Sequence, residues 1–351
     1  MYNTEFYGFD IADKSQIQIF GGCQDLSNFS YGASGFENSW LHLGGGDGGN
    51  CIIDDTNSAY VYFTEWLTGR LYRSSDGGAT YLSTGANPWR KSQVVLSPTN
   101  SNILYLGATG GIRIYSNIRV NWNYVLKSPP GIDNNRITAL EIDKNNSNII
   151  YTSSNGYANV IGHPNYINYV WKSTDNGGTW TSISHNFTNN PNDNPCRNGY
   201  VTDIEINPKN SNEIWVCFGR ATNGIEKVFH SEDGGLTWNP LSFNYPAENI
   251  PALAIQYDEI GDLLYVATDV GIFFFDEING WNQLGIGLPK KLITDIELNF
   301  KRRELWVSTL GRGIWVVELP DEHCYFSNQE DILYLHLHIG MMTKLYVQTF
   351  T

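Results

Sequence analysis

The sequence predicts an all-β protein built from repeated short strands, and three observations support this class. Gly (35), Tyr (21) and Trp (11) are abundant while Met (3) is scarce, a balance that favours strands and tight turns over helices. Alternating apolar and polar segments recur along the chain, and each ends in a polar turn. A Ser-x-Asp-x-Gly-x-Thr phrase recurs at one place within these units. Together these observations predict a seven-bladed β-propeller, or alternatively a six-bladed one, with up to four antiparallel strands in each blade.

The repeat is clearest in three alternating segments, residues 136–143, 200–207 and 292–299, each followed by a polar turn and a second strand. Weaker copies of the first segment end at Asp10, Asp54, Ser97 and Asp258. The seven segment ends are 41 to 64 residues apart. Such a period, with several short strands in each unit, is typical of a propeller blade.

The Ser-x-Asp-x-Gly-x-Thr phrase closes three of the units. Its copies are Ser74, Asp76, Gly78 and Thr80; Ser173, Asp175, Gly177, Thr179 and Trp180; and Ser231, Asp233, Gly235, Thr237 and Trp238. The Asp can accept hydrogen bonds from backbone N–H groups two residues on, and Gly supplies the positive φ that such a turn needs. We expect the Trp ring to pack between sheets while its N–H finds a partner. The phrase is therefore predicted to be a structural hairpin between the two outer strands, without catalytic function.

These phrases resemble Asp-boxes, also called BNR repeats, over about residues 5–320. Residues 21–28, 44–49 and 310–315 are similar to the G-G-T-Q-D-N-G, G-G-D-G-G and Y-G-R-G-L-W segments of secreted, Bacteroidetes-type BNR propellers. Cys23, Leu26 and Ser27 depart from the first of these segments. That family is related to sortilin-type and xyloglucanase-type propellers, and many members carry a sorting domain for type IX secretion. The resemblance implies a propeller scaffold in a secreted or cell-surface protein, and it leaves the function open.

The predicted domains are a propeller over residues 1–320 and a C-terminal tail over 321–351. Residues 331–339 alternate like a strand, so the tail either supplies a closing strand or is disordered. His336 and His338 share one strand face, but no third metal ligand is evident, and the five Cys form no C-x-x-C pair. We therefore expect no metal and no organic cofactor.

The composition argues against several partners. The net charge is −14 and the pI about 4.8, which disfavours nucleic acid and anionic membrane surfaces. No apolar run approaches the roughly 18 residues of a membrane-spanning helix, so no membrane insertion is expected. The first residues lack the basic start and apolar stretch of a signal peptide, which indicates a cytosolic, mature or truncated chain. We expect a monomer.

Polar and aromatic residues near the expected ends of the inner strands are the candidates for ligand binding. The set is Asp25, Arg312, Tyr157, Tyr166 and Tyr169. The three tyrosines belong to a long insertion in the fourth unit, and long loops on a rigid scaffold commonly carry recognition. Tyr and Trp can stack on sugar rings or anchor a protein partner. The first hypothesis is therefore a binding or adhesion module for polysaccharide or for a surface protein.

The second hypothesis is a xyloglucanase-like glycoside hydrolase. Residues 268–271 resemble the T-D-V/I-G-G stretch around one catalytic Asp of that family, although Ile272 replaces the second glycine. Asp269 is the candidate catalytic residue and Asp47 its partner, because glycosidases use two carboxylates. A sialidase is disfavoured, since no F-R-I-P segment occurs. The third hypothesis is an assembly scaffold. It ranks last because Asp-box propellers of that kind usually carry a basic patch, and this acidic chain has only small basic clusters.

Overall fold

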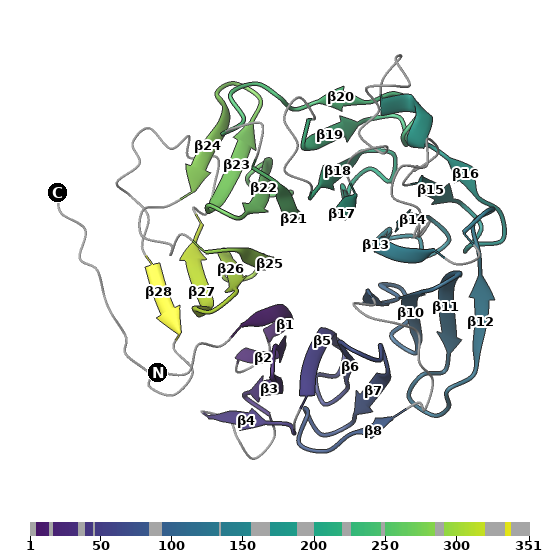
Figure 1. Cartoon of the computed structure of the whole chain (residues 1–351), viewed down its shortest axis with the longest axis vertical. Coiled ribbons are helices and arrows are strands. Elements are labelled where there is room, and N and C mark those ends of the chain that lie inside the picture. The colour runs from purple at the N-terminus through teal and green to yellow at the C-terminus, as the bar shows by residue number, and fades with distance from the viewer. Residues whose placement is uncertain are drawn as a thin grey trace. The chain divides into compact units, whose positions relative to one another are not determined.

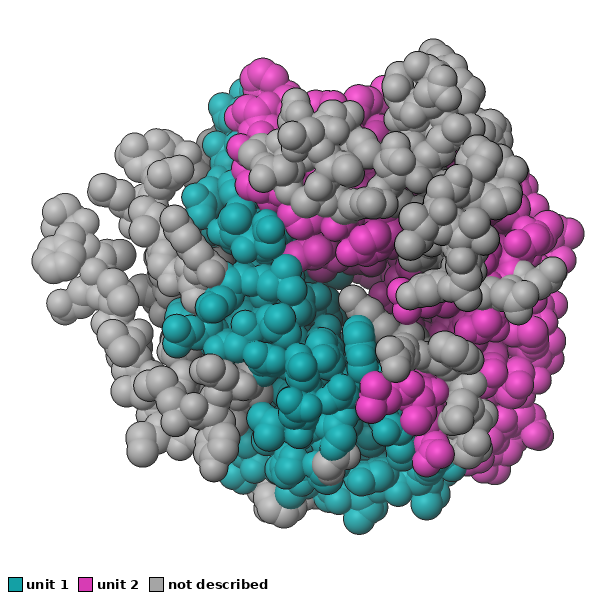
Figure 2. Space-filling view, viewed as in Figure 1, with its two compact units in different colours: residues 1–66, 72–83, 256–351 teal, residues 67–71, 84–255 magenta. Residues whose placement is uncertain are grey.

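The computed structural model describes residues 5–13, 17–33, 39–44, 46–83, 93–132, 135–155, 169–187, 200–219, 226–246, 250–284, 291–319 and 334–337. These residues form strands β1 to β28 and a short 3₁₀ helix, η1 (Ser184–Phe187), so the predicted all-β class is confirmed. Within the described residues, no helix has the length and apolar character that crossing a bilayer requires. The chain divides into two compact units, which are described separately (Figure 2).

Unit 1 comprises residues 1–66, 72–83 and 256–351 (teal in Figure 2). Its first sheet has the order β1-β2-β3-β5-β6-β7-β8, with β4 paired to β3. A short parallel pairing of β3 with β5 joins two sets of four strands in this sheet. The strand bounds are Phe6–Asp13, Ile17–Cys23, Leu26–Tyr31, Trp40–His42, Gly46–Ile53, Val61–Glu65, Leu71–Ser74 and Leu82–Ser83 for β1 to β8.

Two further four-stranded sheets follow, with the orders β21-β22-β23-β24 and β25-β26-β27-β28. Their bounds are Ala252–Asp258, Leu263–Thr268, Ile272–Asp276, Gly280–Leu284, Ile293–Asn299, Glu304–Thr309, Gly313–Glu318 and Tyr334–Leu337. The division between the units falls within β21. The backbone of β28 pairs antiparallel with β27, and the remainder of residues 320–351 lies outside the described residues.

Unit 2 comprises residues 67–71 and 84–255 and contains three four-stranded sheets (magenta in Figure 2). Their orders are β12-β11-β10-β9, β13-β14-β15-β16 and β17-β18-β19-β20 (Figure 1). The bounds of β9 to β16 are Val94–Leu96, Ile103–Ala108, Gly111–Ser116, Tyr124–Lys127, Arg136–Ile142, Ile150–Asn155, Tyr169–Ser173 and Thr181–Ser182. Those of β17 to β20 are Val201–Ile206, Ile214–Phe218, Val228–Ser231 and Asn239–Pro240.

The sequence repeat corresponds to a repeated turn at the end of the first strand of a set of four. A side-chain oxygen there accepts a hydrogen bond from a backbone N–H two or three residues on. Residues in this role are Asp54, Asp143, Asn207, Asp258 and Asn299. The expectation that the first copy of the alternating segment ends at Asp10 is wrong, because β1 continues to Asp13. Asp10 instead accepts the backbone N–H of Ile53 on β5 at 2.6 Å.

The core of unit 1 brings the first strand of the chain against its last described sheet. Phe6 and Phe9 of β1 are buried in one cluster with Trp306 of β26 and Ile314 of β27. Burial of these apolar side chains is the main favourable term in their packing. Residues distant in sequence therefore complete one core.

Candidate functional site

Two glycine-rich segments of unit 1 are in backbone contact. A Cβ placed on Gly22 of β2 would lie 2.1 Å from the carbonyl oxygen of Gly49, and one on Gly48 would lie 2.6 Å from the Cα of Gly22. Only glycine permits strands β2 and β5 to approach this closely. We call this contact of Gly22 with Gly48 and Gly49 the glycine seam. It places the residues that flank these glycines on β2 and β5 side by side.

Asp25 and Asp47 meet beside this seam. The backbone N–H of Asp25 donates to Oδ1 of Asp47 at 2.7 Å. Asp25 occupies the β2–β3 turn with φ of +56°, a left-handed conformation that Asp tolerates better than most residues. The parallel pairing of Ser27 with Asp47 fixes the register. The structure thus joins two sequence candidates, the exposed Asp25 and the half-buried Asp47.

A stacked aromatic pair lies next to these carboxylates. The rings of Tyr7 on β1 and Trp66 after β6 are 4.3 Å apart at their centroids and inclined by 15°. The backbone N–H of Trp66 donates to the carbonyl oxygen of Asp47 at 3.0 Å. Both side chains are half-buried. We call Tyr7, Asp25, Asp47 and Trp66 the aromatic–carboxylate site.

The site has a strongly acidic environment. Burial raises the pKa of the Tyr7 hydroxyl, and the negative charges of Asp47, Glu5 and Asp25 raise it further. All three carboxylates therefore lie close enough to act on one phenol, which stays neutral and can donate or accept a hydrogen bond at physiological pH.

The turn that carries Arg312 approaches the same region through Glu5. Glu5 forms an isolated antiparallel bridge with Leu310, and its carbonyl oxygen accepts the N–H of Gln24 at 2.9 Å. Arg312 is exposed on the β26–β27 turn, and its carbonyl oxygen accepts the indole N–H of Trp315 at 3.1 Å.

Asp269 is exposed on the turn between β22 and β23. The hydroxyl of Thr268 shapes this turn by donating to the carbonyl oxygen of Gly271 at 2.6 Å. Among the described residues, no hydrogen bond or ion pair connects Asp269 with Asp47. The two candidate catalytic carboxylates thus stand on different sheets of unit 1.

The candidate tyrosines have different positions. Tyr157 and Tyr166 lie outside the described residues. Tyr169 opens β15 in unit 2, and its ring lies 5.4 Å from that of Trp171. It packs against a buried cluster that includes Ile150, so much of its ring serves the core.

Sequence reasoning did not select Tyr7 or Trp66. Trp66 directly follows β6 and precedes Gly69 in the β6–β7 turn. Tyr7 falls at an ordinary alternating position. Their 59-residue separation gives no local signal, because the stacking depends on how β1 and β6 are placed within the first sheet.

Two aspartates at equivalent repeat positions connect neighbouring strands. Asp203 accepts the backbone N–H of Ile255 at 3.1 Å, and Asp295 accepts that of Phe9 at 3.3 Å. Each carboxylate also accepts the N–H of the residue that follows it. These bonds explain why both side chains are Asp, since each holds two strands together through backbone groups.

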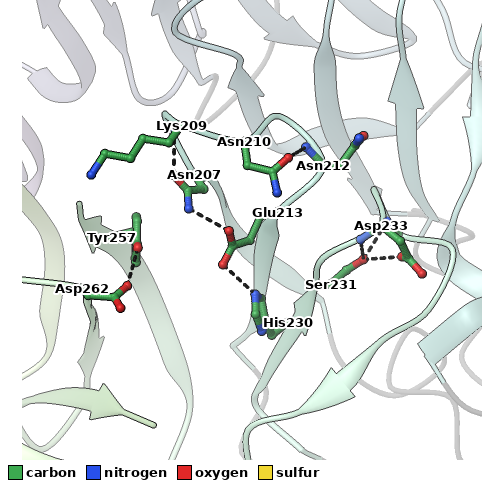
Figure 3. Close-up of polar contacts among 11 residues, drawn as sticks. Asn207, Lys209, Asn210, Asn212, Glu213, His230, Ser231, Asp233, Tyr257 and Asp262 are labelled. Atoms are coloured by element: carbon green, nitrogen blue, oxygen red, sulfur yellow. Dashed lines mark hydrogen bonds and ion pairs between the residues drawn. The ribbon is translucent and has the colours of Figure 1, made fainter.

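The Ser-x-Asp-x-Gly-x-Thr turns share one hydrogen-bond pattern. The Ser231 hydroxyl donates to Asp233 at 2.8 Å and accepts the N–H of Gly235 at 2.8 Å, and Thr237 donates its N–H and hydroxyl to Asp233 at 2.8 and 2.6 Å. Figure 3 shows Ser231 and Asp233 of this turn. The same bonds, between 2.6 and 2.9 Å, occur in the copies that begin at Ser74 and Ser173.

Two details of this turn differ from expectation. The Asp233 side chain accepts a backbone N–H from Thr237, four residues on, because the chain doubles back before reaching it. Trp238 donates its indole N–H to Ile183 at 3.4 Å, as expected. The buried indole N–H of Trp180 has no hydrogen-bond partner among the described residues, so that expectation is wrong for Trp180.

A polar cluster at the first three strands of the β17–β20 sheet is also half-buried (Figure 3). Oε1 of Glu213 lies 3.2 Å from Nε2 of His230, and Oε2 accepts the amide N–H of Asn207 at 2.8 Å. The His230 ring stacks on Trp215 with centroids 4.9 Å apart. The cluster links three strands and leaves the imidazole largely covered, as expected of a packing contact.

No protein-family model matches the chain, and no curated protein matches it in sequence. Solved structures do resemble it. An ancestral GH74 enzyme has 19% identity and a TM-score of 0.63 over 86% of this chain and 41% of its own. The extracellular domain of a one-component system from B. thetaiotaomicron has 15% identity and a TM-score of 0.62 over 90% and 38%. A chain of the COPII outer coat vertex on membranes has 12% identity and a TM-score of 0.67 over 98% and 92%.

These similarities show the β-propeller fold, and at such identities they show the fold alone. The chain spans about two fifths of the length of the GH74 enzyme and of the extracellular domain.

Proposed function

We propose that this chain is an extracellular β-propeller that binds polysaccharide at the aromatic–carboxylate site. The strand sets favour seven blades, because the first sheet contains two sets of four strands and five four-stranded sheets follow. The hydrogen bonds of the three Ser-x-Asp-x-Gly-x-Thr turns support their assignment as Asp-boxes.

The observation that carries the proposal is the Tyr7–Trp66 stack beside Asp47. A sugar ring has an apolar face of C–H groups and a rim of hydroxyls. An aromatic pair receives the face, and carboxylates accept hydrogen bonds from the rim. The glycine seam holds the carboxylates in fixed positions, which lowers the entropic cost of binding.

The test is a panel of plant and microbial polysaccharides, scored for retention of the protein and for release of reducing ends. We expect retention without release. Trp66→Ala and Asp47→Asn should each weaken retention by roughly tenfold or more, because each removes a contact that a flanking residue cannot replace. Asn at position 47 can still accept the Asp25 N–H, so its effect reports the lost charge.

Phe243→Ala and Glu232→Gln are matched controls, since both side chains are exposed and lie outside the site. Retention that is insensitive to Trp66→Ala and Asp47→Asn would place the binding elsewhere. Absence of retention on the whole panel would favour a surface protein as the ligand. Release of reducing ends that disappears in Asp269→Ala would instead establish the glycoside hydrolase.

A further inference from the structure

Charge is distributed unevenly along the chain. Residues 77–132 contain five Lys or Arg and no Asp or Glu, although the whole chain has 36 acidic and 22 basic residues. This stretch includes the sheet β9–β12 of unit 2. An acidic protein thus carries one sheet that is entirely free of carboxylates.

The same sheet ends in an unusual outer strand. β12 is the terminal strand of its sheet and is bonded only to β11 within the described residues (Figure 1). Tyr124, Val125 and Leu126 are 44%, 60% and 48% exposed. Successive side chains of a strand point to opposite faces, so three partly exposed apolar residues in a row mean that neither face of β12 is fully covered.

Four other outer strands are shorter or better covered than β12. β8, β16 and β20 have two residues each, too few to template another strand. β24 has five residues, but three of them are buried. β12 therefore combines length, apolar side chains and an open edge, and Val120 extends the apolar surface just before it with 73% exposure.

Three basic residues lie on β12 or on the chain that leads into it. The guanidinium of Arg113 lies over the Tyr124 ring at 4.8 Å, and Lys127 ends the strand. Arg119 lies in the preceding turn, where it donates to Ser101 at 2.9 Å. Pairing of β12 with β12 of a second copy would bring these cations toward one another, which opposes self-association. Charge complementarity requires an acidic occupant.

We propose that β12 is a docking strand for an acidic, extended segment of a partner protein, which adds to the sheet as a fifth strand. The open edge supplies backbone hydrogen bonds, and the apolar side chains bury alternate residues of the partner segment. The basic side chains favour acidic residues at the remaining positions of that segment. This surface shares no residue with the proposed carbohydrate site, so either function can fail without the other.

The test measures fluorescence anisotropy of labelled eight-residue peptides with the whole protein. One peptide alternates Val with Glu and Asp, a second replaces each acid by Lys, and a third is the acidic peptide with alternate backbone amides methylated. We expect the acidic peptide to bind, the basic peptide to fail, and methylation to abolish binding because it removes edge hydrogen bonds. Raising the salt from 50 to 500 mM should weaken binding.

Val125→Glu should weaken binding of the acidic peptide by about tenfold or more, because the new carboxylate repels the peptide's acidic side chains at the edge. Leu236→Glu is the matched control, since Leu236 is 67% exposed on the Ser231 turn of another sheet. Equal binding by both variants, or binding of the methylated peptide, overturns the proposal. A dimer in sedimentation that Val125→Glu dissociates assigns the edge to a second copy and also overturns it. Binding of heparin without binding of the acidic peptide would likewise overturn the proposal, because the basic residues would then serve a polyanion and not a protein segment.

Discussion

The guanidinium of Arg303 donates two parallel hydrogen bonds, each 2.8 Å long, to the two carboxylate oxygens of Asp258. Asp258 is fully buried and Arg303 is 8% exposed. Asp258 ends β21 and Arg303 precedes β26, so the pair joins two sheets of unit 1. Bidentate hydrogen bonds between arginine and a carboxylate are among the strongest hydrogen bonds in proteins.

Removal of one partner of this pair should be costly. Arg303→Ala leaves an uncompensated buried carboxylate, and we expect a loss of roughly 3–5 kcal/mol in the free energy of unfolding. Arg312→Ala, at an exposed arginine on the β26–β27 turn, should change it by less than about 0.5 kcal/mol. Urea unfolding at pH 7 measures both. Similar midpoints for the two variants would contradict the expectation.

Asp10 should make stability fall as pH rises. Burial raises the pKa of its carboxyl to about 8, against 3.8 ordinarily, and Asp55 and Asp295 add to the effect, while hydrogen bonds from Ile53 and Ile11 oppose it. Between these two values the folded state holds a proton that the unfolded chain releases. The free energy of unfolding should therefore decrease over this window, by at most about 1.4 kcal/mol per pH unit.

Asp10→Asn removes this titration, so its unfolding free energy should depend less on pH between 4 and 8, the range bounded by the two pKa values. Urea unfolding at several pH values compares the slopes. Parallel curves for the wild-type protein and the variant would show that another group is responsible.

The three turn aspartates should act in the opposite direction. The N–H and hydroxyl of Thr179 and the hydroxyl of Ser173 lower the pKa of Asp175. Burial opposes the shift at Asp76 and Asp233, but hydrogen bonds from Thr80 and Thr237 outweigh it and their pKa values are also lowered.

Stability from these groups is present above the ordinary pKa of 3.8 and is lost as pH falls through the lowered values. A variant with all three aspartates changed to Asn should be less stable than the wild-type protein at pH 7. The difference should narrow below about pH 4, where these carboxylates begin to protonate in the unfolded chain while the folded protein still holds them ionised. Thermal unfolding at pH 7 and pH 3 tests this, and an unchanged difference would refute it.

Gly22→Ala should disrupt the glycine seam. Its methyl group would meet the Gly49 backbone at 2.1 Å, and backbone cannot move aside as a side chain can. We expect a loss of about 1–3 kcal/mol or more in the free energy of unfolding, together with loss of ligand retention. Gly8→Ala is the control, because its methyl would meet only side-chain oxygens within 3.4 Å, at 3.1 and 3.3 Å. Equal tolerance of both substitutions would argue against the seam.

The sequence was sufficient where a feature is local. Alternation and turn residues predicted the strands, and the glycine motifs led to Asp25 and Asp47, because conformational constraints are visible within a few residues. The Tyr7–Trp66 stack was not predictable, since it requires β1 and β6 to be placed first. The hydrogen bonding of two indole groups depends on neighbours in the same way: Trp238 donates to the carbonyl oxygen of Ile183, whereas Trp180 has no partner among the described residues. Asp269 resembled a catalytic residue locally, but its spatial partners are not encoded in its flanking residues.

The hydrogen bond from Phe9 to Asp295 spans 286 residues of chain, and this separation matters during translation. Unit 2 is almost continuous, whereas unit 1 takes residues from both ends of the chain. At ribosomal rates of about 5–20 residues per second, roughly 15–60 s pass between the synthesis of β1 and that of Asp295. Phe6 and Phe9 cannot reach Trp306 and Ile314 during that interval. The nascent chain therefore presents an apolar first strand for which a chaperone can compete, until the last strands emerge and bury it.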